Sequence, residues 1–302
     1  MSTTQDWQTR IGRQRDWLWR GWQVRYSFQI PSNQSTLNST PIILIHGFGA
    51  AIEHWRKNIP VLAENYPVYA LDLIGFGASR KVKTFYSTYL WAEQIYDFWR
   101  IFINQPVIII GNSIGSLVAM TAAHLYPVML KGIVMLSLPD VSLRQEMIPK
   151  PLQPVVRAIE NIVACPLLIK ILFKVFIRQP LIIRNWLKIA YADNQAITEE
   201  LVKIISQPPQ DLAADIAFNA LFRSLSRPQF APSAKEILPQ LQIPILLIWG
   251  LQDRMVPAKL AKMYSNLNPL ITLVELENVG HCPHDECPER FHQIFLAWLA
   301  NS

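Results

Sequence analysis

The sequence predicts an α/β protein with a mostly parallel, doubly wound sheet and an inserted helical segment. Two observations support this expectation: short apolar runs recur along the chain, and amphipathic stretches fill most of the intervals between them. Apolar runs of this length are typical of strands that are buried on both faces of a parallel sheet. Strands that alternate with helices form a doubly wound sheet.

The expected strands follow in chain order. The aromatic and β-branched segment WLWRGWQVRYSFQI at 17–30 predicts one or two opening strands. The later runs are PIILIH at 41–46, PVYALDL at 67–73, PVIIIG at 106–111, KGIVMLS at 131–137, PILLIWG at 244–250 and ITLVEL at 271–276. Between them, TYLWAEQIYDFWRIFI at 88–103 is typical of an amphipathic helix.

One interval is too long for a simple connection. The segment between the runs at 131–137 and 244–250 has helical periodicity and several prolines. A structureless loop of that length is rare in a compact domain. We therefore expect a helical lid over 139–232, above the carboxyl edge of the sheet, which divides the core into 1–138 and 233–302.

The composition excludes several classes of protein. The chain has 302 residues, of which 51% are hydrophobic and 17% are charged, which argues against disorder. This length can bury a full core without a disulfide or metal. Three cysteines, Cys165, Cys282 and Cys287, are too few for a disulfide framework and favour a reducing compartment. We expect neither a secretory signal nor a transmembrane helix, because 1–26 has no apolar core and the most apolar helix candidate, 165–177, carries Lys170 and Lys174.

A glycine-flanked serine follows the strand at 106–111. Gly111-Asn112-Ser113-Ile114-Gly115 is a G-x-S-x-G motif that precedes the helical segment LVAMTAAHLYP. At a strand–turn–helix junction this motif forms a nucleophile elbow, in which the glycines permit a strained and crowded turn. Ser113 would stand on the sheet edge, at the positive end of a helix.

A serine nucleophile needs a base and an orienting carboxylate, which in this architecture follow in the order Asp or Glu and then His. Asp253 lies in WGLQDRMVP, directly after the strand at 244–250, and His281 lies in NVGHCPHDE, directly after the strand at 271–276. Both should reach the sheet edge of Ser113. Asp140 in LSLPD could also reach His281, although we prefer a turn or a helix cap for it.

The reaction would also need donors for an oxyanion. Backbone N–H groups after the nucleophile and after the third strand serve this purpose, which nominates Ile114 and, in the segment HGFG at 46–49, Phe48. We expect His46 to brace this loop rather than to react. The expected substrate-binding residues are Gly47, Asn112 and the lid residues around Phe173 and Phe176.

Two other motifs suggest ligands but do not fit them. The segment DLIGFGAS at 72–79 lacks the G-x-G-x-x-G spacing of a nucleotide site. His281, Cys282, His284 and Cys287 do not have the spacing of a zinc site. We expect no metal and no cofactor.

Basic residues are concentrated in the expected lid. Residues 141–191 contain eight Lys and Arg residues and only two Glu residues. This excess of positive charge equals the net charge of +6 of the whole chain. Lys170, Lys174 and Arg178 are spaced four apart among apolar residues. This stripe suits peripheral contact with an anionic membrane, or a lid helix packed on the core with its lysines in water. An apolar inner face would favour a bulky apolar substrate, and no motif for nucleic acid accompanies the charge.

Together these motifs resemble the α/β-hydrolase superfamily from about Trp17 to Leu299. The segments HGFG, DLIGFGAS, GNSIGS, GLQDRMVP and GHCPHDECPER occur in family order. The segments PIILIHGFGAAIEHWRKNIPVLAENYPVYALDLIGFGAS and GHCPHDE followed by PE are similar to the pheophytinase and chlorophyll dephytylase group, which hydrolyses the phytyl ester of chlorophyll pigments. This chain departs from that group at Ser116, where the group commonly has glycine, and in its shorter N-terminal region.

The resemblance implies a Ser113–His281–Asp253 triad and a long isoprenoid ester, such as the phytyl ester of chlorophyll or pheophytin, as substrate. It also implies an intracellular protein, either cytoplasmic or peripheral to a thylakoid-type membrane. Haloalkane dehalogenases and epoxide hydrolases would need aspartate in place of Ser113. The alternatives that remain are a general carboxylesterase, a carbon–carbon bond hydrolase, a cofactor-free haloperoxidase, a hydrolase-fold receptor with vestigial turnover and a membrane-associated scaffold.

Overall fold

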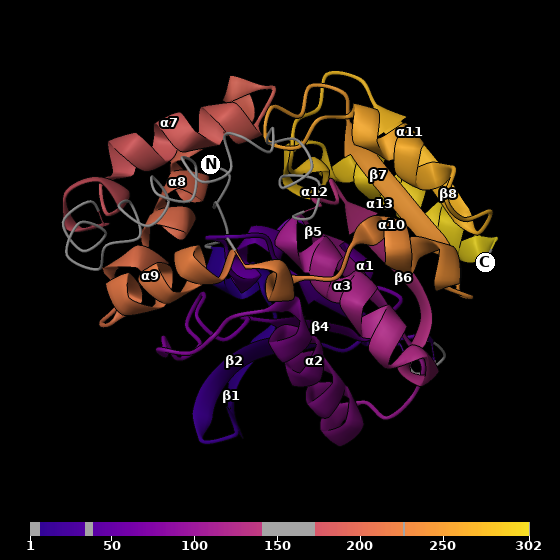
Figure 1. The fold of residues 1–302 in the computed structure, drawn as a ribbon, viewed down its shortest axis with the longest axis horizontal. Helices are drawn as coiled ribbons and strands as arrows, with labels where there is room; N and C mark the ends of the chain where they lie inside the picture. Colours follow the sequence, from indigo (N-terminus) through magenta and orange to yellow (C-terminus); the bar gives the residue numbers. More distant parts are fainter. Residues whose placement is uncertain (1–6, 34–38, 141–172, 226, 302) are drawn as a thin grey trace.

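A computed structural model describes residues 7–33, 39–140, 173–225 and 227–301, and the side chains of Lys174 and Phe176 are outside this description. Eight strands form one sheet in the order β1-β2-β4-β3-β5-β6-β7-β8 (Figure 1). The strands are β1 (Arg13–Trp19), β2 (Trp22–Gln29), β3 (Ile42–Ile45), β4 (Val68–Leu71), β5 (Val107–Asn112), β6 (Leu130–Leu136), β7 (Ile245–Gly250) and β8 (Ile271–Leu276). β1 and β2 form an antiparallel hairpin that joins β4, and the pairs from β4 to β8 are parallel. The expected fold is confirmed.

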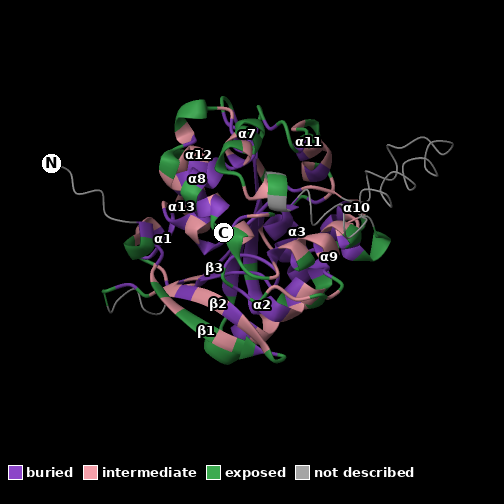
Figure 2. Cartoon of the chain, turned by 90° about the vertical axis from the view of Figure 1, so that its left-hand side faces the viewer, coloured by how far each residue is buried: buried purple, intermediate pink, exposed green. Residues whose placement is uncertain are grey.

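The hairpin begins earlier than the sequence indicated. β1 starts at Arg13, four residues before Trp17, and most of its residues are exposed or half-buried. β3 and β5, inside the sheet, are buried at every position, and Figure 2 shows this difference between edge and centre. An edge strand pairs on one side only and therefore tolerates polar residues, which conceal its start in the sequence.

Alternate residues of the central strands face two separate cores. Ile43 and Ile45 belong to the core on one face, and Ile42 and Leu44 to the core on the other. This alternation follows from the two-residue period of a strand, and it explains why the predicted runs are apolar throughout. The first core is covered by α2 (Thr88–Phe102), α3 (Ile114–Leu125), α10 (Ala234–Ile237) and α11 (Lys259–Ser265), and the second by α1 (Ile59–Leu62) and α13 (Pro288–Ala300).

Three helices of the expected lid lie in the described residues: α7 (Pro180–Ala190), α8 (Glu199–Ser206) and α9 (Ala214–Leu225). Figure 1 shows them together on one side of the molecule, away from α2 and the β1–β2 hairpin. They are preceded by a π-helical turn, Phe173–Ile177. Residues 141–172, which include Lys170, lie outside the described residues, so the boundaries 139–232 remain a prediction. No helix in the described part of the chain has the length and apolar character needed to cross a bilayer.

Local sequence signals fix several helix starts. The Ser87 hydroxyl caps α2 by accepting the Leu90 N–H at 3.1 Å, and Thr198 caps α8 by accepting the Leu201 N–H at 3.2 Å. Such caps satisfy amide groups that have no partner inside the helix. α7 begins at Pro180, whose missing N–H costs nothing at a first helical position.

Candidate active site

Ser113 occupies a strained turn between β5 and α3. Its backbone angles are φ 54° and ψ −114°, a conformation that L-residues rarely adopt. Its N–H donates to the carbonyl oxygen of Leu136 on β6 at 2.8 Å. A Cβ atom on Gly111 would collide with the Gly115 carbonyl oxygen, and one on Gly115 would collide with that of Ile45. Both glycines of the motif are therefore required by close backbone approach.

Ser116 fastens the elbow to the neighbouring strands. Its hydroxyl donates to the Gly111 carbonyl oxygen at 2.7 Å and accepts the Leu136 N–H at 3.0 Å. The side chain is fully buried. At the position where the sequence departs from the pheophytinase group, this chain therefore carries a structural hydroxyl.

His281 and Asp253 are hydrogen bonded in a buried position. His281 Nδ1 lies 2.8 Å from Asp253 Oδ2, and the exposed fractions of the two residues are 4% and 9%. The other carboxylate oxygen, Oδ1, accepts the N–H groups of Met255 and Val256, both at 2.8 Å. The carboxylate is thereby held in one orientation and places the imidazole proton on Nδ1, which leaves Nε2 free to accept a proton.

The alternative acid, Asp140, has a different neighbour. Burial, together with the nearby negative charge of Asp140, raises the pKa of the Tyr264 phenol. The carboxylate that is hydrogen bonded to His281 Nδ1 belongs to Asp253.

Asn112, expected in substrate binding, holds the loop of the candidate base. Its Nδ2 donates to the His281 carbonyl oxygen at 3.0 Å, and its Oδ1 lies 3.9 Å from the Cys282 sulfur. The side chain is buried, and it lines the same cavity as Ser113. The amide therefore ties the elbow to the histidine loop across 169 positions of sequence.

The other side of the histidine loop rests on the end of α7. The His281 N–H donates to the Ala190 carbonyl oxygen at 2.6 Å, and a Cβ atom on Gly280 would collide with that oxygen. The Glu286 carboxylate accepts the N–H groups of Gly280 and Ala192, both at 2.7 Å. The position of His281 therefore depends on helix α7.

The two backbone amides of the oxyanion prediction, those of Ile114 and Phe48, follow β5 and β3 in the fold. Ile114 is the first residue of α3, and Phe48 lies in the loop after β3. Among the residues that the structure describes, neither amide donates to another protein group. Gly47 brings the two loops together, since a Cβ atom there would lie 2.9 Å from Asn112 Oδ1 and 3.6 Å from Ser113 Cβ.

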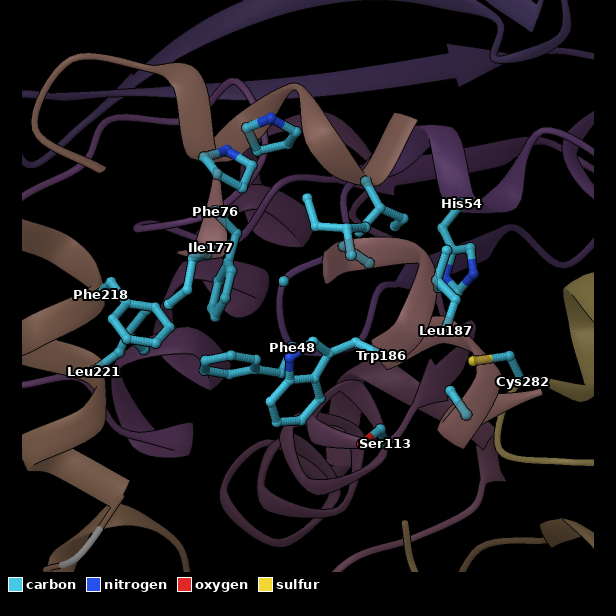
Figure 3. A pocket seen from close by; sticks show the side chains of 18 of the residues that line it. Phe48, His54, Phe76, Ser113, Ile177, Trp186, Leu187, Phe218, Leu221 and Cys282 are labelled. Carbon is cyan, nitrogen blue, oxygen red and sulfur yellow. The ribbon is translucent and has the colours of Figure 1, made fainter. Parts of the chain in front are cut away.

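A mainly apolar cavity opens above Ser113. Its volume is about 340 Å³, within the usual range for small-molecule sites. Figure 3 shows Ser113 at this cavity with the aromatic side chains of Phe48, Phe76, Trp186 and Phe218. Gly47, Asn112, His281 and Phe173 also line it. Of the two lid residues that we expected to bind substrate, Phe173 lines this cavity, whereas the Phe176 side chain lies outside the described residues.

His46 supports the loop that carries Gly47. Its Nδ1 donates to the Gly47 carbonyl oxygen at 2.7 Å, and its Nε2 accepts the Leu73 N–H at 3.1 Å. Burial lowers the pKa of His46 to about 4. The imidazole is therefore neutral at pH 7 and joins the loops after β3 and β4, as expected.

Replacing His46 with glutamine should flatten the acid side of the stability curve. The imidazole has a pKa of about 4 in the folded chain and 6.5 as its reference value. The stability that it contributes is present above pH 6.5 and is lost as the pH falls towards 4. His46→Gln, which keeps an acceptor for Leu73, should remove up to about 1.4 kcal/mol of this loss per pH unit. Urea unfolding of both proteins at pH 7 and pH 5 measures the difference, and parallel curves would contradict it.

A buried chain of polar side chains, which the sequence did not predict, lies beside the cavity. His54 Nε2 donates to the Tyr191 oxygen at 2.9 Å, and the Tyr191 hydroxyl donates to Asp285 Oδ2 at 2.7 Å. Arg56 Nη1 lies 2.9 Å from Asp285 Oδ1. Burial would raise the pKa of Asp285, but Arg56 holds it below its usual value. His54 and Tyr191 line the cavity, yet they are 137 positions apart, so no local spacing could have linked them.

The His–Cys cluster is used for structure. His284 Nε2 lies 3.3 Å from His54 Nδ1, and the Cys287 sulfur lies 3.3 Å from the Pro283 carbonyl oxygen. Within the described ranges, no group of three or more His, Cys, Asp or Glu residues is arranged to hold a metal ion.

The fold and the elbow define an α/β hydrolase. Residues 40–288 match the family described as alpha/beta hydrolase fold, and the chain belongs to that family. It is 28% identical over 263 residues to the uncharacterized hydrolase YugF of Bacillus subtilis, a match that covers 87% of this chain and 88% of YugF.

Two further similarities involve proteins of stated activity. The chain is 25% identical over 301 residues to the chloroplastic pheophytinase of Arabidopsis thaliana, which covers 87% of this chain and 62% of that protein. A crystal structure of a serine hydrolase involved in carbazole degradation, the CarC enzyme, superposes with a TM-score of 0.78 at 21% identity, covering 96% of this chain and 99% of that one. At that identity the superposition shows a shared fold.

Proposed function

We propose that this chain is a serine esterase in which Ser113 is the nucleophile, His281 the general base and Asp253 the carboxylate that orients His281. The observation that carries the proposal is the hydrogen bond of 2.8 Å between His281 Nδ1 and Asp253 Oδ2 beside a cavity that Ser113 and His281 both line. The strained backbone of Ser113 supports it, because strain of this kind is typical of the nucleophile elbow.

The chemistry follows from the positions of the protons. His281 Nε2 accepts the Ser113 proton while Oγ attacks the ester carbonyl carbon, and the N–H groups of Ile114 and Phe48 donate to the resulting oxyanion. The tetrahedral intermediate collapses, the bond to the alcohol oxygen breaks, and Nε2 returns the proton to that oxygen. Water then attacks the acyl-enzyme with His281 again as base, and Asp253 stabilises the imidazolium in both halves.

The proposed substrate is a long isoprenoid ester, such as the phytyl ester of chlorophyll or pheophytin. The cavity above Ser113 is walled by aromatic and aliphatic side chains from several lid segments, among them Phe173, Trp186 and Phe218. Apolar walls favour an apolar chain, since its burial releases about 25 cal/mol per Å². The similarity to pheophytinase supports the choice of the phytyl ester.

A pigment substrate would place the protein at a membrane. We extend the proposal to an intracellular protein that contacts an anionic membrane, of the thylakoid type, through its basic lid. Of the cations behind this idea, Lys188 is exposed on α7, whereas Arg184 is paired with Glu199. Lys170 and the Lys174 side chain lie outside the described residues.

Incubation with detergent-solubilised chlorophyll a and pheophytin a tests the substrate. We expect the purified protein to release free phytol with chlorophyllide or pheophorbide, resolved by chromatography, and the Ser113→Ala variant to release none. Good hydrolysis of a nitrophenyl ester without phytol release would support the esterase activity and contradict the pigment as substrate. Phytol release by both proteins would overturn the proposed mechanism. Absence of turnover on every ester would favour the receptor or scaffold alternatives.

A further inference from the structure

A second cavity lies on the opposite side of α9 from Ser113. Its volume is about 1120 Å³. On α9, Phe218 and Leu221 face the cavity above Ser113, whereas Asn219 and Arg223 face the second cavity. Phe173 lines both cavities, so helix α9 and this ring form the partition between them.

The second cavity is strongly cationic. Its described lining contains four basic residues and one acidic residue, and we call it the cationic cavity: Lys83, Arg178, Arg223, Arg227 and Asp215. Positive charges gathered around a concave surface attract anions, because the low-dielectric walls concentrate their field.

Two of the three guanidinium groups in this lining, those of Arg178 and Arg227, are held by uncharged neighbours. Arg178 Nε donates to the Pro209 carbonyl oxygen at 3.0 Å, and its guanidinium lies 5.7 Å from the ring centre of Phe173. The guanidinium of Arg227 lies 5.6 Å from the ring centre of Phe85. Carbonyl and ring contacts orient a guanidinium without neutralising it, so the charges of Arg178 and Arg227 remain for a ligand.

One buried amide donor at this cavity is also unsatisfied. Asn219 Nδ2 is buried and donates to no acceptor within the described residues. A buried donor without an acceptor is costly, and such groups are rare in folded proteins. An anionic oxygen in the cationic cavity would supply the acceptor. Asn219 stands between Asp215 and Arg223, four residues from each, on the same face of α9.

We propose that the cationic cavity binds the phosphate group of an anionic ligand. Phosphate offers several oxygens to several donors and pairs with guanidinium groups in fork geometry. Apolar side chains lie beside the charges: Leu212 is 96% exposed and Ile216 is 47% exposed, and both line the cavity. This combination fits free phosphate or the headgroup of a phospholipid. The inference does not depend on the esterase chemistry, because none of the charged residues of the cationic cavity lines the cavity above Ser113.

Calorimetry with inorganic phosphate and co-sedimentation with vesicles distinguish the two sources. The vesicles are phosphatidylcholine with and without phosphatidylglycerol. Binding of phosphate alone supports a soluble ligand, whereas binding only to vesicles that contain phosphatidylglycerol supports a headgroup. Absence of both, or equal binding to both kinds of vesicle without phosphate binding, overturns the proposal.

Variants assign the binding to this cavity. Arg178→Gln with Arg227→Gln should weaken binding about tenfold or more, because hydrogen bonds to charged groups are strong. The matched control is Arg100→Gln with Lys131→Gln. It removes the same amount of charge at exposed positions outside the lid, and it should leave binding unchanged. An equal loss in the control would show general charge attraction only, contrary to the proposal.

A variant that should tighten binding makes the test independent of folding, because a misfolded protein would not bind more tightly. Asp215→Asn removes the carboxylate of the described lining and should tighten phosphate binding. Salt should weaken binding in every protein, since partly exposed charges are screened. If Asp215→Asn leaves the affinity unchanged or lowers it while its thermal melting matches wild type, the proposed site is wrong.

Discussion

Replacing Ser113 with alanine should abolish ester turnover while substrate binding is retained. Without the hydroxyl no acyl-enzyme can form, and the loss in kcat should be about 10⁴-fold or more. Binding should remain because the apolar walls contributed by Phe48, Trp186 and Phe218 are unchanged. The folded state should also be unaffected, since alanine meets the same backbone strain at φ 54° as serine does. Steady-state kinetics on a nitrophenyl ester and equilibrium dialysis with a non-hydrolysable apolar ether measure the two effects.

The neighbouring serine provides a matched control. Ser116→Ala removes the same hydroxyl group three positions along the chain, at a site that does not line the cavity. It leaves the Leu136 N–H and the Gly111 carbonyl oxygen without their partner, which should cost about 1–3 kcal/mol of stability. Turnover per folded molecule should stay near wild type. The assignment of the nucleophile fails if Ser113→Ala keeps its turnover, or if Ser116→Ala loses turnover to the same degree without unfolding.

The sheet could be predicted because its information is local. Each later run that we expected to form a strand, from 41–46 to 271–276, coincides with a strand from β3 to β8, and of these only β8 lies at an edge of the sheet. Strands buried on both faces have to be apolar at every position, and this pattern is visible in six residues. β1 obeys no such constraint along its outer edge, so its first four residues were not recognised.

The sequence predicts the chain order of the candidate catalytic residues, but not the contacts that hold their loops in place. Ser113, Asp253 and His281 each follow a strand directly, and parallel strands deliver their following loops to one edge of the sheet. The contacts that hold those loops are long-range: Asn112 reaches the His281 carbonyl oxygen, and Tyr191 reaches Asp285. Nothing in the local sequence distinguishes an amide that will bind substrate from one that will hold a loop. Only the folded arrangement makes that distinction.

The sequence also does not predict which surfaces the lid residues form. Helical periodicity predicts that α9 has two faces, but not that Phe218 and Arg223 would line two different cavities. Charge counting predicted a basic lid, and it could not tell that Arg178 would be oriented by the Pro209 carbonyl oxygen. The position of a charge is decided by packing partners that lie far away in the sequence.

Replacing Asp253 with asparagine should lower kcat by about 10⁴-fold with little change in the fold. Oδ1 of Asp253 accepts the N–H groups of Met255 and Val256, so the amide oxygen of asparagine should occupy that position. Its NH₂ group would then face His281 Nδ1, which would have to act as an acceptor. The imidazole proton would move to Nε2, and His281 could no longer accept the proton of Ser113.

Asp140→Asn is the matched control, because Asp140 is the other carboxylate that the sequence allowed as partner of His281. The substitution removes the negative charge beside Tyr264, which should have a modest effect on stability and little effect on kcat. Parallel measurements of kcat, KM and thermal melting on both variants separate the two roles. A large loss of kcat in Asp140→Asn with a small loss in Asp253→Asn would transfer the orienting role to Asp140. If both variants keep wild-type kcat, no carboxylate orients the base, and the proposed proton transfer through His281 is wrong.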